Sequence, residues 1–243
     1  MNASSRSKCV RRTALLLSLG IVLALPGSAF AQRICRSEAH EWAAANRGNL
    51  PQTYEELSVM PLAYRRAAYA ALPAAAKSRI WRTQLERVLE METELTPAQK
   101  ALLLEAVQLA TPDTFAATRD RSSLKYRQMR SRVESLETRA KEAFGADRAA
   151  RIFARIGPAD TDTLYFIDRQ KAEAIVPGLQ MVEELTSGQQ QPAPDTGCSC
   201  SDASDYCSSG FNCTGGGCIR ISDECGTFWT YDCDGSCKVN AAT

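Results

Sequence analysis

The stretch CSCSDASDYCSSGFNCTGGGCIRISDECGTFWTYDCDGSC, residues 198–237, holds eight of the ten cysteines in the chain. Such a density is typical of a scaffold held by disulfides. Its few large apolar side chains cannot offset the chain entropy of ordering it, about 1.5 kcal/mol per residue. We therefore expect disulfides, each contributing roughly 2–4 kcal/mol, to hold the segment together. The cysteines are Cys198, Cys200, Cys207, Cys213, Cys218, Cys225, Cys233 and Cys237.

The spacing of these cysteines favours disulfides over a zinc site. Zinc thiolates usually come as C-x₂-C pairs, and no such pair occurs in the stretch. We therefore expect neither a metal nor another cofactor. Eight cysteines allow 105 pairings, and the sequence does not choose among them. Cys198 and Cys200 are too close along the chain to pair comfortably with each other, so we expect each to pair elsewhere.

Three aromatic residues, Phe228, Trp229 and Tyr231, lie between Cys225 and Cys233. In so small a module we expect at least one of them to stay partly exposed. One interpretation makes them possible contacts to a target, because aromatic side chains bury much area at low entropy cost. The other interpretation, which we favour, makes them the small core of the module itself.

The segments before the cysteine-rich stretch have a different composition. Residues 187–197, SGQQQPAPDTG, are polar and contain two prolines, which predicts a flexible, exposed linker that proteases can cut. We expect residues 198–243 to form a disulfide-rich module and residues 32–186 to form an all-α helical domain of about six helices. The helical domain is a possible pro-region.

Local signals support the helical prediction. Residues 53–56 (TYEE) and 96–99 (TPAQ) fit the capping box, and Thr111 precedes a proline as a second helix start of the Thr-Pro kind. Apolar residues then recur at helical spacing, and Gly145 is expected to end a long helix. We see no useful β-alternation except around residues 164–166. The apolar positions include Trp81, Leu85, Val88, Leu89, Val133, Leu136, Ala140 and Phe144.

Residues 1–31 fit a secretory signal peptide. A basic start is followed by an apolar run and by a small-x-small site that predicts cleavage between Ala31 and Gln32. We therefore expect a secreted or periplasmic protein with no integral membrane span after cleavage, in a compartment where cysteines pair. Cleavage removes Cys9 and leaves Cys35 over. An odd cysteine is either free or linked to a second chain, and we favour a free thiol or a minor role.

Charge and missing motifs narrow the function. The net charge is +1, so we expect no nucleic-acid partner. His40 is the only histidine, which removes most arrangements of nucleophile, histidine and acid; we expect it to be an ordinary, partly exposed helix residue. The sequence contains no H-E-x-x-H, G-x-S-x-G or phosphate-loop motif. We therefore expect the protein not to be an enzyme.

The cysteine-rich stretch resembles the fulvocin C-related bacteriocin family. Residues 198–207 look like the family's opening C-S-C-S-x-A-S-D-Y-C, and residues 225–231 are similar to its C-G-T-x-W-x-Y run. Residues 61–66 and 77–81 resemble, more loosely, the amino-terminal region of exported proteins related to this family. The resemblance implies a secreted peptide with four disulfides and antibacterial activity.

Two functions follow as expectations. In the first, the chain is a bacteriocin-like precursor, and a processing protease cuts the linker at 187–197 to release a module that acts on a component of a bacterial target cell. In the second, the chain is never cut. The helical domain then binds a partner, and the cysteine-rich module is a structural cap.

Overall fold

The structure, a computed structural model, describes residues 36–118, 120–157 and 198–239. We call residues 36–157 the helical domain and residues 198–239 the cysteine module. The signal peptide with its cleavage site, Cys35, the possible strand at 164–166 and the linker lie outside the described residues, so those expectations stay predictions.

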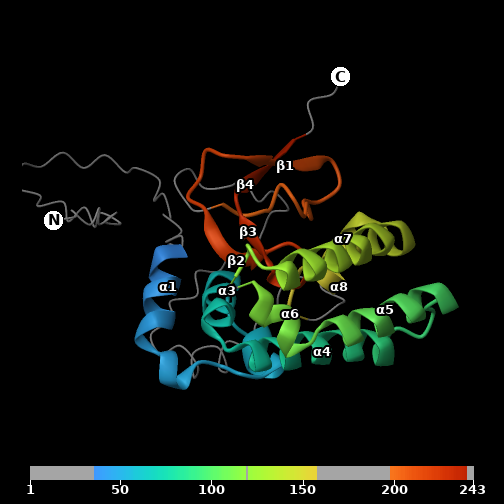
Figure 1. Cartoon of the computed structure of the whole chain (residues 1–243), viewed down its shortest axis with the longest axis horizontal. Helices are drawn as coiled ribbons and strands as arrows, with labels where there is room; N and C mark the ends of the chain where they lie inside the picture. Colours follow the sequence, from blue (N-terminus) through green and yellow to red (C-terminus); the bar gives the residue numbers. More distant parts are fainter. Residues whose placement is uncertain (1–35, 119, 158–197, 240–243) are drawn as a thin grey trace, which may run out of the picture.

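The predicted fold class is confirmed: a helical domain is followed by a small disulfide-rich module (Figure 1). The described part of the helical domain has eight α-helices, where the sequence led us to expect about six. Two of the eight, α2 and α6, are short, and each begins at one of the predicted threonine caps. The helices are α1 (Arg36–Ala45), α2 (Tyr54–Ser58), α3 (Leu62–Ala71), α4 (Ala74–Met91), α5 (Pro97–Leu109), α6 (Pro112–Ala117), α7 (Leu124–Phe144) and α8 (Ala146–Phe153), with a 3₁₀ turn η1 (Arg47–Asn49) after α1.

The predicted helix boundaries are confirmed at several ends. Thr53 and Thr96 both form complete capping boxes, with Glu56 and Gln99 as the reciprocal partners. At the end of α7, the longest helix in the part of the chain that the structure describes, Gly145 has φ of 76° and donates its amide to the carbonyl of Lys141. This left-handed conformation suits a residue without a side chain and stops α7.

The helices pack around one apolar core. Helix α4 contacts α2, α5, α6 and α8, while α7 packs on α5, α6 and α8. Arg65 is buried in this core, where its guanidinium donates to the carbonyls of Leu57, Ser58 and Met60 at the end of α2 and to that of Ile156. Leu57 and Ser58 belong to the last turn of α2, where carbonyls lack their regular helical partners, so Arg65 fastens α2 and the segment after α8 to α3.

The cysteine module consists of two small antiparallel sheets. Strand β1 (Phe211–Gly215) pairs with β4 (Gly235–Val239), and β2 (Ile221–Cys225) pairs with β3 (Tyr231–Cys233). A 3₁₀ turn, η2 (Thr227–Trp229), joins the second pair. In Figure 1 the β2·β3 pair lies beside the helices, whereas β1 and β4 lie farther out.

Gly235 lies where three segments of the module meet. Its carbonyl accepts the amides of Ser199 and Cys200, and its own amide donates to the carbonyl of Cys200. A Cβ atom built on it would lie 2.6 Å from the carbonyl oxygen of Thr214 and 2.7 Å from the sulfur of Cys213. Only glycine fits at this crossing.

All eight cysteines of the module form disulfides with one another. Cys198 and Cys200 pair elsewhere, as expected, and the other pairings are new information from the structure. Two of the disulfides attach β1 and β4, a third ties the start of the module to the connection between β1 and β2, and the fourth closes the β2–η2–β3 unit across a Cα–Cα distance of 5.1 Å. The pairs are Cys198–Cys218, Cys200–Cys213, Cys207–Cys237 and Cys225–Cys233. Four disulfides indicate an oxidising compartment.

Candidate functional site

The cysteine module packs against the helical domain, and the sequence did not predict this interface. We call residues 227–232 the docking segment. Phe228, Trp229 and Tyr231 in this segment are 0–1% exposed and belong to the same apolar cluster as the core of the helices. The expectation that at least one of them stays partly exposed is wrong, because the helical domain supplies the apolar surface that the small module lacks.

The aromatic rings of the docking segment pack against rings of three helices. The Trp229 ring meets the rings of Tyr69 (α3) and Trp81 (α4) nearly at right angles, with centroids 5.1 and 5.9 Å apart. Phe228 lies against Trp81 and Phe153, at 5.3 and 6.5 Å. Aromatic pairs favour such edge-to-face arrangements. In the folded chain the three possible target contacts are therefore covered, and they belong to the core of the helices and not to a small core of the module alone.

Hydrogen bonds fix the orientation of these rings. The indole Nε1 of Trp229 donates to the carbonyl of Ala154 at 2.8 Å. The indole Nε1 of Trp81 donates to the Tyr69 hydroxyl at 2.9 Å, and that hydroxyl donates to the carbonyl of Phe228 at 3.2 Å. Burial raises the pKa of Tyr69, so the phenol keeps the proton that it donates.

A buried carboxylate on α7 forms a polar contact with two segments of the module. Glu137 is 7% exposed, and its Oε2 accepts the hydroxyls of Ser204 and of Thr227, the latter at 3.0 Å. The Nζ of Lys141, one turn farther along α7, lies 2.6 Å from Oε1 of the same carboxylate. A buried carboxylate is tolerated only when it is paired and hydrogen-bonded. The contact of Glu137 therefore requires these particular partners in this geometry.

The same lysine reaches a second segment of the module. Lys141 Nζ donates to the carbonyl of Asp205 at 2.6 Å and lies 4.6 Å from the centre of the Tyr206 ring. The carboxylate of Asp205 in turn accepts the amides of Cys207 and Cys213, each at 2.8 Å. Helix α7 therefore contacts the residue that positions the backbone of two cysteines.

An acidic edge of the module meets arginines. Arg121 donates to Asp232 at 2.6 Å and to Asp223 at 3.0 Å, and Arg220 donates to Asp232 at 2.7 Å. Burial alone would raise the pKa of Asp232, but hydrogen bonds from both arginines outweigh it and lower that pKa. For Asp223, burial dominates over the charges of Lys77 and Arg121, and its pKa is raised.

His40 has a more specific environment than the sequence suggested. Its side chain is 37% exposed, as expected for a helix residue on the surface, but its Nε2 lies 2.5 Å from Oε1 of Glu224, which is fully buried. Helix α1 therefore contacts β2 directly beside Cys225. The only histidine of the sequence is therefore a contact between the helical domain and the cysteine module.

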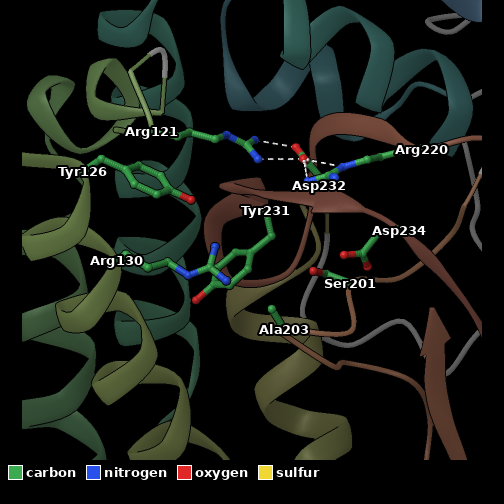
Figure 2. Close-up of a pocket in the computed structure, with 9 residues that line it drawn as sticks. All are labelled: Arg121, Tyr126, Arg130, Ser201, Ala203, Arg220, Tyr231, Asp232 and Asp234. Atoms are coloured by element: carbon green, nitrogen blue, oxygen red, sulfur yellow. Dashed lines mark hydrogen bonds and ion pairs between the residues drawn. The ribbon is translucent and has the colours of Figure 1, made fainter. Parts of the chain in front are cut away.

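A pocket of about 160 Å³ opens beside this interface (Figure 2). Arg121 and Arg220 approach Asp232 from opposite sides, and the guanidinium of Arg130 lies across the ring of Tyr231, 3.4 Å from its centre. Arg121 and Arg130 thus connect the module to the helical domain, whereas the Arg220–Asp232 pair lies within the module. The lining residues are Arg121, Tyr126, Arg130, Ser201, Ala203, Arg220, Tyr231, Asp232 and Asp234.

A second cluster gathers sulfur atoms. The sulfurs of Cys200, Cys207 and Cys237 lie within 4.8 Å of one another. Each of them is already bonded in a disulfide, so in this state none is the thiolate that a metal ion requires.

Among the described helices, none is both long and apolar enough to cross a membrane.

Sequence reasoning identified the aromatic residues of the site but not their partners. Glu137 is 67 residues from Ser204 and 90 from Thr227 along the chain, and no local pattern links such positions. One signal was present in the sequence: the docking segment holds more aromatic surface than a module of this size can bury. Such an excess of aromatic surface would have indicated that another part of the chain covers these side chains.

No protein-family model, curated protein or solved structure matches the chain. The resemblance of the cysteine module to a bacteriocin family therefore depends on the motifs quoted above and enters the function only as a proposal.

Proposed function

We propose that the protein is the precursor of a secreted, bacteriocin-like antibacterial peptide. The helical domain keeps the cysteine module latent, and cleavage of the linker at residues 187–197 begins its release. One observation carries the proposal: Phe228, Trp229 and Tyr231, within the part of the module that resembles a bacteriocin, are buried against the helical domain. Residues that would contact a target cell are thereby covered until the module leaves.

The disulfide pattern supports separability. The eight cysteines pair inside the module, so a cut in the linker leaves its covalent frame intact. A cut alone does not free it, because the aromatic packing and the contacts of Glu137, Lys141 and Arg121 persist. Release in this proposal therefore has two steps, proteolysis and then dissociation, and the intermediate is a cut but non-covalently assembled protein.

The test uses oxidised protein collected from culture medium. One sample stays intact, and a second is cut in the linker and left assembled. A third is cut, and its module is then separated in denaturant without reductant, so that the disulfides survive. Each sample is placed on lawns of related bacteria, with reduced and alkylated module as the control. We expect killing by the free oxidised module alone. The proposal is wrong if the free module is as inactive as the intact chain, or if the medium never contains a cut product.

A second candidate function is favoured by the shared core. Because Phe228 and Trp229 pack in the same apolar cluster as Trp81 and Phe153, the chain also fits an uncut, secreted binding protein in which the module is a structural cap. In that case, cutting the linker leaves the protein assembled under all native conditions. Deleting the module then weakens binding to the partner of the helical domain, and no sample kills.

A further inference from the structure

The docking segment has a backbone conformation that its own residues disfavour. Phe228 and Trp229 have φ of 56° and 51°, and Asp223, two residues before Cys225, has φ of 55°. The left-handed region is sterically unfavourable for residues with a Cβ atom, above all for bulky ones. Two consecutive aromatic residues in this region persist only where surrounding contacts over-determine them.

Those contacts come largely from the helical domain. The carbonyl of Phe228 is held by the hydroxyl of Tyr69, the indole of Trp229 by the carbonyl of Ala154, and the hydroxyl of Thr227 by Glu137. Both rings are fully buried among side chains of the helices. The helical domain thus stabilises the turn that the segment does not favour by itself.

The same contacts position cysteines. The docking segment lies between Cys225 and Cys233, and the residue directly before each of them is gripped from the helical side: Glu224 by His40 at 2.5 Å and Asp232 by Arg121 at 2.6 Å. These contacts involve no sulfur, so they are available to the module before any disulfide exists. In the folded chain they flank the two cysteines of the Cys225–Cys233 bond.

The segment ahead of Cys207 is held in the same way. Ser204 donates to Glu137, and the carbonyl of Asp205 accepts Lys141. The carboxylate of Asp205 then holds the amides of Cys207 and Cys213. A second group of cysteines is therefore placed by residues that α7 contacts directly.

We propose that the helical domain is an intramolecular template for oxidative folding: it binds the reduced cysteine module and selects the pairing of its cysteines. Docking promotes the Cys225–Cys233 bond, which leaves six cysteines and reduces the 105 possible pairings to 15. Docking of residues 204–205 further reduces the number of pairings that are open to the remaining six cysteines. This activity goes beyond the proposed antibacterial function, because it concerns how the module is made and holds whether or not the module kills bacteria.

The redox chemistry requires a small-molecule disulfide such as oxidised glutathione. One cysteine thiolate attacks it, forms a mixed disulfide and releases one small thiol. The second cysteine thiolate then displaces the other small thiol and closes the protein disulfide. Two protein thiols are oxidised, one small disulfide is reduced to two thiols, and the two protons pass from the cysteines to the released thiols. The helical domain supplies position, not electrons.

The test compares the chain with itself. Residues 32–243, carrying a specific protease site in the linker, are reduced and denatured, and half of the sample is cut. Both halves refold at roughly 1 µM in a glutathione buffer, where the uncut linker gives an effective concentration of about 1 mM. Pairs are read by peptide mapping without reduction. We expect native pairing in the uncut chain and at least about tenfold less in the cut chain, with a recovery as concentration rises.

Two further measurements sharpen the test, and the first of them, the order in which the pairs form, distinguishes templating from a general loss of stability. Trapping at early times should show Cys225–Cys233 as the first pair in the uncut chain. In uncut chains, Trp229→Ala should reduce native pairing, whereas Phe211→Ala, which removes an aromatic ring that is 41% exposed on β1, should not. Equal pairing in cut and uncut chains, a late Cys225–Cys233 bond, or equal effects of the two variants would each overturn the proposal. Killing assays are independent of all three readouts, so failure here is distinguishable from failure of the antibacterial function.

Discussion

The two halves of the cysteine module are held by different forces. The inner half, β2 with η2 and β3, places its aromatic residues in the core of the helices and has one disulfide within it. The outer half, β1 with β4, has an exposed surface in which Cys213 is the one buried residue of β1. Two disulfides, Cys200–Cys213 and Cys207–Cys237, attach it. Where apolar burial is available, one cross-link accompanies it; where burial is lacking, cross-links take its place.

The largest expected difference between the halves comes from removing one aromatic ring from each. Trp229→Ala leaves a cavity and an unpaired carbonyl at Ala154, so we expect a loss of about 3–5 kcal/mol in the free energy of unfolding. Phe211→Ala on the outer half should cost less than about 1 kcal/mol, in the range of surface substitutions. Denaturant titration of helical circular dichroism, with disulfides intact, measures both. Similar losses would show that the two halves are held alike.

Removing one disulfide from each half gives the next largest effect. By the chain-entropy estimate, the Cys207–Cys237 bond, with a sequence separation of 30, contributes about 3.6 kcal/mol, and Cys225–Cys233, with a separation of 8, about 2.5 kcal/mol.

The location of the damage should also differ. Replacing both residues of the Cys207–Cys237 pair by alanine should speed amide hydrogen exchange in β1 and β4 and leave the helices protected. The same change at Cys225 and Cys233 should leave the docking segment protected, because the helices still hold it. Rapid exchange at Trp229 in the second variant would contradict the comparison.

The smallest effect concerns the acidic edge and its dependence on pH. Because the pKa of Asp232 is lowered in the folded state, its ionised form stabilises the fold above the ordinary carboxyl pKa, and this contribution is lost as pH falls through the folded pKa. Asp232→Asn should therefore reduce stability by roughly 1.5 kcal/mol at pH 7. The difference from the parent protein should disappear as pH falls below the folded pKa of Asp232, which lies below the ordinary carboxyl value.

Thermal unfolding across that pH range measures the effect, with Asp202→Asn, an exposed aspartate of the same module, as the control. Asp223 has the opposite sign. Its pKa is raised by burial, so its protonation as pH falls toward the ordinary carboxyl pKa relieves a cost in the folded state. A pH-independent loss in Asp232→Asn would show that its hydrogen bonds matter without its charge.

The features that sequence alone predicted are local. Capping boxes at Thr53 and Thr96 and the stop at Gly145 depend on neighbours within one helical turn, and all three are confirmed. The buried faces around Trp81 and Val133 follow from helical spacing in the same way. The cysteine content predicted the disulfide-rich module, because composition alone decides whether a segment can form a core.

The features that the sequence alone could not predict are contacts between residues far apart along the chain. The choice of disulfide partners needs the crossing at Gly235, and the place of Trp229 needs α3, α4 and the residues after α8. The prediction that disulfides alone hold the module is therefore incomplete. For the inner half, much of the apolar surface that appeared to be missing is supplied by the helical domain, a contact between residues more than 70 positions apart.

Around the crossing at Gly235, one position must remain glycine, whereas neighbouring exposed positions can accept other residues. That position admits no other residue without displacing Thr214 or Cys213, yet the side chains around it on β1 and β4, such as Phe211, Asn212, Lys238 and Val239, face outward. A library of random residues at those outward positions should still assemble on an unchanged frame. The outer strands are thus a natural place to engraft new recognition specificities onto this scaffold.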